Sequence, residues 1–426
     1  DRGKPRGIIP AAVSFKDDGF GYGKTWYEPG LYWSYFNWPG ALGLLCEQFF
    51  TTYDLTGDEK YLVPLEEALR ILSKWEGKIP KNPKPGGEAW CAQRLMSGGM
   101  QDAYGKWRLM SGRTQYDDFL TRKGPPYVRF RLTGDKSILV AECNAIIDRT
   151  RHNFELLTNE VRYTDRVAVG NTNRLFAMYT GASGDSSYYP YYAVTWENTT
   201  KNFAALVLDA NRRHVKVLAH NFLPQAREVR MRLWRLRPGA YRVAWGPDRD
   251  HDDEMDAVAD SAVYRVRHRG RAVRITLPSR VTQVIEVSLQ SPLDAPPIAE
   301  RPDLAFGPDA LSLVPPRAKP GDPVTIRATV HNIGSAPAKD VRVSFFEHGG
   351  NPLGVARAAV IEAPLDLEPR TWVAEVQWRM PDRDVTIGAV ARLGDSEQLE
   401  ITRDNNSANL LVHGAAQSAR ERKMTR

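Results

Sequence analysis

The stretch from His152 to Arg166 contains residue types that could remove a proton next to a carboxylate. His152 and Tyr163 are able to act as base or acid, while Asn153 and Arg166 are able to neutralise the neighbouring acid group. A lyase that cleaves chains of uronic acids needs this combination. The structural alternative is a histidine at a helix end that interacts with the helix dipole.

Carboxylates supply the chemistry of a second enzyme class, since a glycoside hydrolase needs two of them on either side of the scissile bond. Glu28 is the candidate within the aromatic stretch described next. No pair of carboxylates has a diagnostic spacing, and a helix cap or a surface charge is the commoner role of such residues. The other candidates are Asp17, Asp18, Glu88, Asp102, Asp117 and Asp118.

An unusually aromatic stretch runs from Trp26 to Trp38, where seven of thirteen residues carry aromatic rings. Pro29 and Gly30 interrupt any regular element, so we expect a loop. Rings with polar tips suit a sugar, because they stack on its flat apolar face while O–H and N–H groups form hydrogen bonds. Alternatively, the rings fill a junction between helices and a later sheet. The aromatic residues are Trp26, Tyr27, Tyr32, Trp33, Tyr35, Phe36 and Trp38.

A third candidate is the acidic segment from Gly246 to Asp256. Aspartates at alternate positions can direct their carboxylates to one centre, as calcium-binding loops do. The match to an EF-hand loop is incomplete, since its sixth position is Asp253 instead of glycine and its twelfth is Ala259 instead of glutamate. We therefore weigh a structural calcium site against a solvated hairpin tip, and expect no other cofactor. The predicted ligands are Asp248, Asp250, Asp252 and Asp256.

The 426-residue chain carries a formal net charge of +7, and its basic residues are concentrated between Arg212 and Arg280. Such a segment could hold a polyanion or form a solvated arginine-rich surface. Because we find no motif that reads DNA or RNA, we expect a polysaccharide or cell-surface glycan as partner and no nucleic acid. No apolar run approaches the length of a membrane span.

The three cysteines, Cys46, Cys91 and Cys143, lack zinc-ligand spacing, so we expect core thiols with at most one disulfide. The chain opens on DRGKPRG, without a methionine or the apolar core of a signal peptide. We therefore expect a piece of a longer or processed protein, with any targeting signal upstream.

Helices must position the first candidates. In residues 42–53 and 61–72, apolar side chains recur at three- and four-residue steps. The phrase LTGDEKYL at 55–62 returns as LTGDKSIL at 132–139, which predicts stacked helical hairpins. With the aromatic loop and the β-rich part that follows, residues 1–185 resemble the (α/α)-toroid polysaccharide lyases and glycoside hydrolases. The visible hairpins are too few to close a toroid, so we expect a partial one.

Period-two alternation replaces the helical pattern in residues 186–290, where eight short strand-like runs predict an antiparallel β-sandwich. A proline-rich linker spans residues 291–301. Short alternating strands in residues 302–413 are typical of an immunoglobulin-like sandwich, and the basic tail 414–426 is expected to be disordered. The predicted fold class is multidomain α + β.

Four motifs distinguish the last predicted domain: Pro302-Asp303-Leu304, Lys319-Pro320-Gly321-Asp322, VHNIGSAPAKDVRV at 330–343 and DNNSAN at 404–409. By these motifs the domain resembles the CARDB family, the cell-adhesion-related domain found in bacteria. The resemblance implies an extracellular bacterial module without catalytic activity. Within it, Asn332 and Gly334 are expected to make a tight turn.

Together these features predict a secreted bacterial protein that binds and degrades a polysaccharide, with a lyase narrowly preferred to a hydrolase. The alternative is a non-catalytic surface protein for adhesion or glycan binding, in which the aromatic loop holds the glycan. Both interpretations place the protein outside the cell or on its surface.

Overall fold

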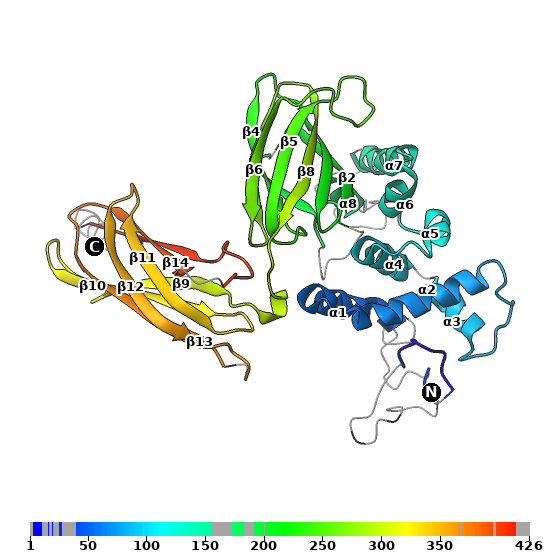
Figure 1. Cartoon of the computed structure of the whole chain (residues 1–426), viewed down its shortest axis with the longest axis horizontal. Helices are drawn as coiled ribbons and strands as arrows, with labels where there is room; N and C mark the ends of the chain where they lie inside the picture. The colour runs from blue at the N-terminus through cyan, green and yellow to red at the C-terminus, as the bar shows by residue number, and fades with distance from the viewer. Residues whose placement is uncertain are drawn as a thin grey trace. The chain divides into compact units, whose positions relative to one another are not determined.

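The computed structural model (Figure 1) shows a multidomain α + β chain that divides into two compact units. The first unit comprises Asp1–Arg265 with Ala272–Pro292, and the second comprises Val266–Arg271 with Leu293–Arg426. The structure describes residues 3–10, 16, 19, 25–27, 40–96, 98–154, 173–182, 191–199, 201–366, 368–394 and 398–414. The predicted division of the first unit into a helical domain and a sandwich domain stays a prediction.

Short helices form the N-terminal part of the first unit. The two helices expected from apolar spacing are present, whereas the helix after Gly98 is not anticipated by the sequence because its glycine pair suggests a break. The elements are α1 (Gly40–Thr56), η2 (Glu59–Leu62), α2 (Val63–Trp75), α3 (Glu88–Leu95), α4 (Gly98–Ser111), α5 (Asp117–Lys123), α6 (Pro126–Thr133), α7 (Ser137–Phe154) and α8 (Asn173–Thr180). Phe50, Leu69 and Trp107 lie in their shared core and have no exposed surface.

The repeated TGD phrase forms the same corner twice. Gly57 and Gly134 have φ angles of 71° and 73°, in the left-handed region that glycine adopts at little cost. Their amides bond to carbonyls four residues earlier, at 2.7 Å in both corners. Asp58 and Asp135 then each accept a hydrogen bond from the amide two residues on. The echo in the sequence therefore corresponds to a repeated helix–turn–helix geometry.

Eight strands follow within the described residues, and they belong to the first unit except for Val266 and Arg271 at the ends of β6 and β7. They are β1 (Val194–Glu197), β2 (Phe203–Ala210), β3 (His214–Asn221), β4 (Arg227–Leu233), β5 (Gly239–Pro247), β6 (Asp260–Val266), β7 (Arg271–Leu277) and β8 (Thr282–Pro292). They form a three-stranded sheet of order β1-β4-β7 and a five-stranded sheet of order β2-β3-β8-β5-β6. Burial alternates along β3, β4 and β7, with Val217, Met231 and Ile275 fully buried. This alternation is what period two predicts for antiparallel strands with one buried face.

The later helices pack on β2. Tyr127 and Phe130 of α6, with Leu139 of α7 and Met178 of α8, form an apolar cluster against leucines of β2. The buried Tyr127 hydroxyl donates a 2.8 Å hydrogen bond to the carbonyl of Val207, so the ring is fixed at both ends. The α6–α7 corner is thereby held close to the five-stranded sheet.

Two more antiparallel sheets form the second unit and share one apolar core. Their orders are β13-β10-β9 and β12-β11-β14-β15. Ile326 and Val330 from the first sheet meet Val343, Phe345 and Ile387 from the second. The elements are η3 (Ile298–Glu300), β9 (Leu304–Val314), β10 (Pro323–Asn332), β11 (Ala338–Glu347), β12 (Pro352–Ile361), β13 (Arg370–Arg379), β14 (Val385–Leu393) and β15 (Ser407–Val412).

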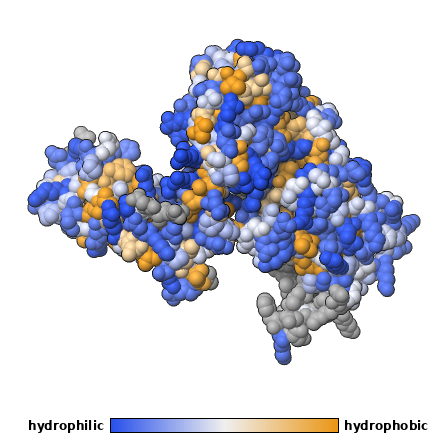
Figure 2. All heavy atoms as spheres, in the orientation of Figure 1, coloured by the Kyte–Doolittle hydropathy of each residue, from blue (hydrophilic) through white to orange (hydrophobic). Residues whose placement is uncertain are grey.

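The three cysteines are free thiols. Cys46 and Cys91 are buried, and burial raises the pKa of Cys91 to about 12, which leaves an unreactive core thiol. Among the described residues, no helix has both the length and the apolar character needed to cross a bilayer. Hydrophilic residues prevail on the visible face of the molecule (Figure 2).

Candidate functional site

The acidic segment forms the connection between β5 and β6, and its two ends are fixed by backbone hydrogen bonds. The Asp248 amide donates to the Thr282 carbonyl at 3.0 Å, and the Ala259 amide donates to the Trp245 carbonyl at 2.9 Å. The loop folds back so closely that a Cβ on Gly246 would lie 1.9 Å from the Ala257 carbonyl oxygen. A glycine is therefore required where the loop crosses the end of β5.

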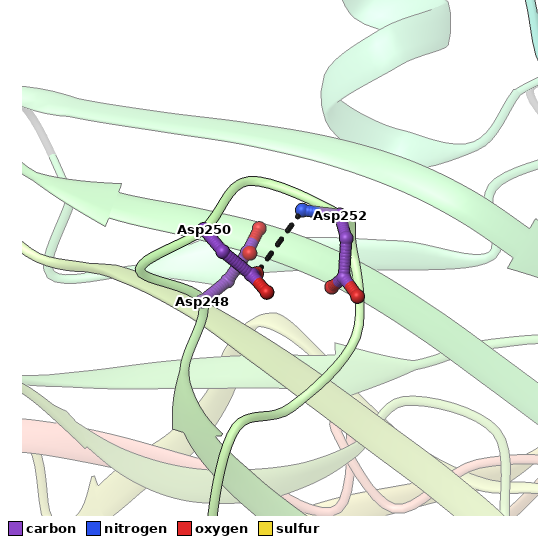
Figure 3. A group of neighbouring side chains, drawn as sticks. All are labelled: Asp248, Asp250 and Asp252. Atoms are coloured by element: carbon purple, nitrogen blue, oxygen red, sulfur yellow. Dashed lines mark hydrogen bonds between the residues drawn. The ribbon is translucent and has the colours of Figure 1, made fainter.

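Three aspartates of this loop bring their carboxylates together, as Figure 3 shows. One oxygen from each of Asp248, Asp250 and Asp252 lies within 4.8 Å of the others. Asp250 and Asp252 are exposed, whereas Asp248 is 2% exposed and its buried Oδ1 has no hydrogen-bond partner. A buried carboxylate oxygen without a donor is unfavourable unless a positive species binds it.

Backbone geometry holds the carboxylates in this arrangement. Asp250 Oδ1 accepts from the Asp252 amide at 3.4 Å, and Asp252 Oδ1 accepts from the Glu254 amide at 2.8 Å. His251 and Asp253 have φ angles of 64° and 69°, which places both in the left-handed region. Asp253 thus adopts the conformation that an EF-hand loop obtains from glycine, since aspartate tolerates this region better than most residues.

Basic groups neutralise the other acids of the loop, whereas no basic side chain of the described residues pairs with these three. Asp253 Oδ1 lies 2.5 Å from Lys136 Nζ, and Glu254 Oε1 lies 2.5 Å from Lys216 Nζ. Asp256, the fourth predicted ligand, is outside the cluster, and its Oδ2 accepts from the amide of Arg249 at 3.0 Å. The structure therefore brings together three of the four predicted ligands.

The charge of the cluster defines what it can bind. Two like charges at this separation repel by about 1 kcal/mol in water and by ~3 kcal/mol at an effective dielectric constant of ~20. A divalent cation would replace this repulsion by attraction. Carboxylate oxygens without nitrogen or sulfur ligands suit a hard ion such as Ca²⁺ and do not suit Zn²⁺.

The predicted catalytic residues are only partly within the described chain. His152 and Asn153 lie in the last turn of α7, where the sequence predicted a helix end. Glu28, Tyr163 and Arg166 lie outside the described residues. A shared catalytic site therefore stays a prediction.

Two of the predicted sugar-binding rings are described, and both pack in the helical part. Trp26 is 3% exposed and belongs to the helical core, and Tyr27 is partly buried against that core. Both rings meet Trp90, at centroid distances of 6.2 Å and 5.2 Å. In this structure Trp26 is a core residue with no face open to a ligand. Tyr32, Trp33, Tyr35, Phe36 and Trp38 lie outside the described residues.

Two hydrolase candidates are engaged in ion pairs. Glu88 accepts hydrogen bonds from Lys74 and, at 3.2 Å, from Arg70. The hydrogen bond from Lys74 holds the pKa of Glu88 below its usual range, which opposes a role as general acid. Asp117 forms two hydrogen bonds with the Arg108 guanidinium. Both carboxylates therefore have a structural role in ion pairs of the helical part.

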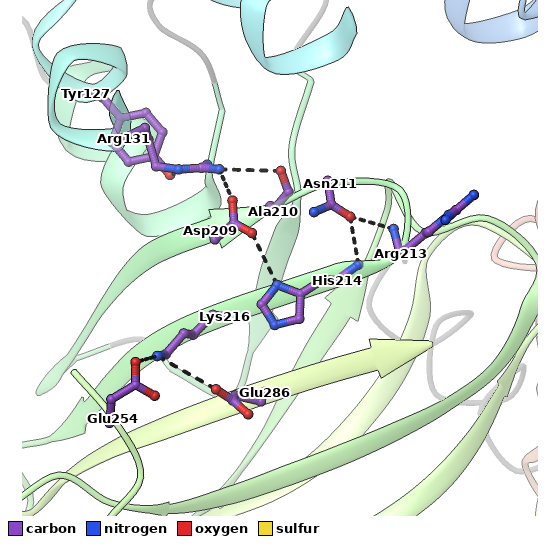
Figure 4. Close-up of polar contacts among 10 residues, drawn as sticks. All are labelled: Tyr127, Arg131, Asp209, Ala210, Asn211, Arg213, His214, Lys216, Glu254 and Glu286. Carbon is purple, nitrogen blue, oxygen red and sulfur yellow. Dashed lines mark hydrogen bonds and ion pairs between the residues drawn. The ribbon is translucent and has the colours of Figure 1, made fainter. Parts of the chain in front are cut away.

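Sequence reasoning missed a polar network between α6 and the β2–β3 hairpin, shown in Figure 4. Asp209 bonds to the buried Arg131 guanidinium and, at 3.2 Å, to His214 Nδ1. Burial opposes ionisation of Asp209, but His214 and Arg131 outweigh it and lower its pKa to about 2. No local spacing signals this network, because Arg131 is far from its partners in the sequence. The network anchors α6 to the β2–β3 hairpin.

No protein-family model matches the chain, and no curated protein matches it. Among solved structures, the CARDB domain of a Pyrococcus furiosus protein matches in a solution structure, at 16% identity and a TM-score of 0.21, over 27% of this chain and 96% of that one. A crystal structure of the same domain, in complex with di-metal ions, matches at 18% identity and 0.21, over 27% and 90%.

A β-glucuronidase from Bacteroides uniformis is also similar, at 11% identity and a TM-score of 0.21. That match covers 52% of this chain, which spans only 32% of the enzyme's length. The structural neighbours thus include both a glycosidase and a CARDB domain. Identities and TM-scores in this range assign no activity, substrate or ligand to the chain.

Proposed function

We propose that residues 248–252 bind Ca²⁺ and that the ion fixes the β5–β6 loop of an extracellular, multi-module protein. The observation that carries the proposal is the buried Asp248 Oδ1, which lacks a partner and faces the carboxylates of Asp250 and Asp252. Local acids that do have cationic partners surround this cluster. Among the acids of residues 246–256, those of the cluster have no cationic partner within the described residues, so an ion would complete the charge balance.

The composition of the site sets its expected affinity. Two ligands are exposed, and the twelfth position is Ala259, where an EF-hand has a bidentate glutamate. A dissociation constant of about 10⁻⁴ to 10⁻³ M follows by comparison with extracellular calcium modules. Such a site fills in a calcium-rich medium outside the cell, which agrees with the proposed location.

Titration calorimetry with CaCl₂ tests the proposal on the full chain. The wild type should bind one ion per chain, and a tenfold excess over the dissociation constant should stabilise it by about 1.4 kcal/mol. The double variant Asp250→Asn/Asp252→Asn should lose both effects. Asp260→Asn, at an exposed position just beyond the loop, is the matched control. Equal binding by the double variant and the wild type would refute the assignment.

We propose as a second function that the protein acts on an acidic polysaccharide. Supporting it, Arg242, Arg265, Arg274 and Arg280 of the first unit are exposed, and none makes an ion pair within the described residues. Unpaired guanidinium groups suit carboxylates of a glycan. In a lyase, His152 and Tyr163 would be base or acid and Asn153 and Arg166 would neutralise the uronate, with Glu28 reserved for a hydrolase. The alternative is glycan adhesion without catalysis.

A panel of acidic polysaccharides separates these alternatives. Lyase action produces unsaturated uronates, which are followed by their absorbance. Adhesion gives retention in affinity gels without product, and the retention should weaken with salt. If the full-length protein neither retains nor cleaves any member of the panel, the polysaccharide proposal is wrong, whereas the calcium proposal is unaffected.

A further inference from the structure

We infer that the cation of the β5–β6 loop also fastens the α6–α7 corner to the five-stranded sheet, so that Ca²⁺ controls the rigidity of the helical part. The inference rests on the proposed calcium site. It concerns the outward-facing acids of the loop, which do not contribute to that site.

The loop divides its acids between two directions. Asp248, Asp250 and Asp252 face one another, whereas the next residue, Asp253, turns away and meets Lys136. The left-handed φ of 69° at Asp253 produces this change of direction. Lys136 directly follows the aspartate that caps the TGD corner between α6 and α7. A single loop conformation therefore serves both the ion site and the corner.

A second contact holds the loop from the sheet side. Glu254 pairs with Lys216 of β3, whose side chain is 13% exposed and also lies 3.7 Å from Glu286 of β8 (Figure 4). Lys216 is thus bound by acids from the loop and the sheet. The loop bridges the helical corner and two strands through neighbouring residues, Asp253 and Glu254.

The ion and these contacts must reinforce each other. Without a cation, the three like charges repel, and the loop populates more open conformations in which Asp253 and Glu254 leave their lysines. With the cation, the loop is ordered and the pairs form. Coupling between two sites is reciprocal, so removing Lys136 should weaken Ca²⁺ binding by about two- to fivefold, the range of a single partly exposed ion pair.

The first TGD corner offers an internal control. Lys60 lies beside that corner and pairs with its own capping residue, Asp58, at 2.6 Å. The two corners share their backbone hydrogen bonds, but the contacts described for Lys60 include no residue of the acidic loop. Only the second corner should therefore respond to the ion.

Hydrogen exchange of the full chain, in millimolar Ca²⁺ and in chelator, measures this response. In the wild type, Ca²⁺ should slow exchange several-fold both in residues 249–256 and in residues 133–140. In Lys136→Ala, the loop should remain protected while the corner loses its response. Asp253→Asn should behave in the same way, since asparagine keeps the left-handed backbone but not the charge. Lys60→Ala should match the wild type.

The outcomes separate the inference from the site. Protection of the loop without protection of residues 133–140 in the wild type would overturn the inference and leave the calcium site standing. An unchanged response of the corner in Lys136→Ala and Asp253→Asn would overturn it as well. If Ca²⁺ protects neither segment, the site itself is absent and the inference falls with it.

Discussion

Two clusters of carboxylates, one in each unit, differ in the groups that surround them. The β5–β6 loop of the first unit gathers three aspartates, two of them exposed, and offers them no cationic side chain. The second unit buries Asp303 and Glu400, which are 5% and 0% exposed. The negative charge of the first cluster must be balanced in a surface loop, whereas that of the second must be balanced in a protein interior.

Glu400 shows how a buried carboxylate is satisfied by the protein alone. Its Oε2 accepts from the Leu304 amide at 3.3 Å and from Asn406 Nδ2 at 2.7 Å, and its Oε1 accepts from Arg403 Nε at 3.3 Å. These donors fix the turn before β15 against the start of β9. The interaction needs no ion.

Asp303 represents an intermediate case. Its buried Oδ1 has no hydrogen-bond partner. Burial raises the pKa of Asp303 to about 6, with a further contribution from Glu400 and against the lowering effect of Asn405. Hydrogen-bond donors and a bound proton are thus two ways to balance a buried carboxylate in the second unit, and the proposed cation would be a third way in the β5–β6 loop.

The largest effect should follow removal of Glu400. Glu400→Ala leaves a buried amide, a carboxamide and a guanidinium without their acceptor, so the second unit should lose about 3 kcal/mol of unfolding free energy. Chemical denaturation of the variant and the wild type measures the difference. Glu375→Ala is the control, because the exposed Glu375–Arg327 pair should contribute at most about 1 kcal/mol. Similar losses in both variants would contradict the contrast between buried and exposed acids.

The next effect is a pH dependence that belongs to Asp303. The folded pKa of about 6 exceeds the ordinary aspartate pKa of 3.8, so the folded state binds the proton more tightly and gains stability as the pH falls through 6. Between pH 7 and pH 5 the wild type should gain about 1.4 kcal/mol relative to Asp303→Asn. Denaturation of both proteins at the two pH values measures this difference.

Comparison with Asp303→Asn is essential, because His268 of the same unit works in the opposite direction. Burial lowers the pKa of His268 to about 4, so this residue removes stability as the pH falls below 6.5. His268 is present in both proteins, and its contribution cancels in the difference. A constant difference between pH 7 and pH 5 would show that Asp303 keeps an ordinary pKa.

Regular alternation made the sheets predictable from the sequence. Along β7, Val273, Ile275 and Leu277 are buried and Arg274 is exposed between them, as the period-two pattern of residues 186–290 predicted. The helix α4 was missed, because Gly98 and Gly99 signal a break whereas the packing of Trp107 in the core stabilises a helix. Tertiary contacts outweighed local propensity there.

Whether a candidate site was predictable depends on how far apart its residues lie in the sequence. The aspartate triad was predictable, because alternate residues of one loop are neighbours whatever the rest of the fold does. The turn at Asn332 and Gly334 was also predictable, and Asn332 Oδ1 accepts from the amides of Gly334 and Asp303. By contrast, the pairing of Lys136 with Asp253 joins distant segments and leaves no periodic signal. Such contacts emerge only from the fold.

The smallest expected effect is a change in Ca²⁺ affinity on removal of Asp256, which the sequence predicted as a ligand. Its Oδ2 accepts from the Arg249 amide and closes the loop outside the cluster, so Asp256→Ala should weaken Ca²⁺ binding only about two- to threefold. Calorimetry compares it with Asp250→Asn/Asp252→Asn. Asp322→Ala, which removes a similar turn contact to the Lys319 amide in the second unit, should leave binding unchanged. A loss as large as that of the double variant would mean that Asp256 swings inward and coordinates the ion, since a residue that only closes the loop affects affinity through its geometry alone.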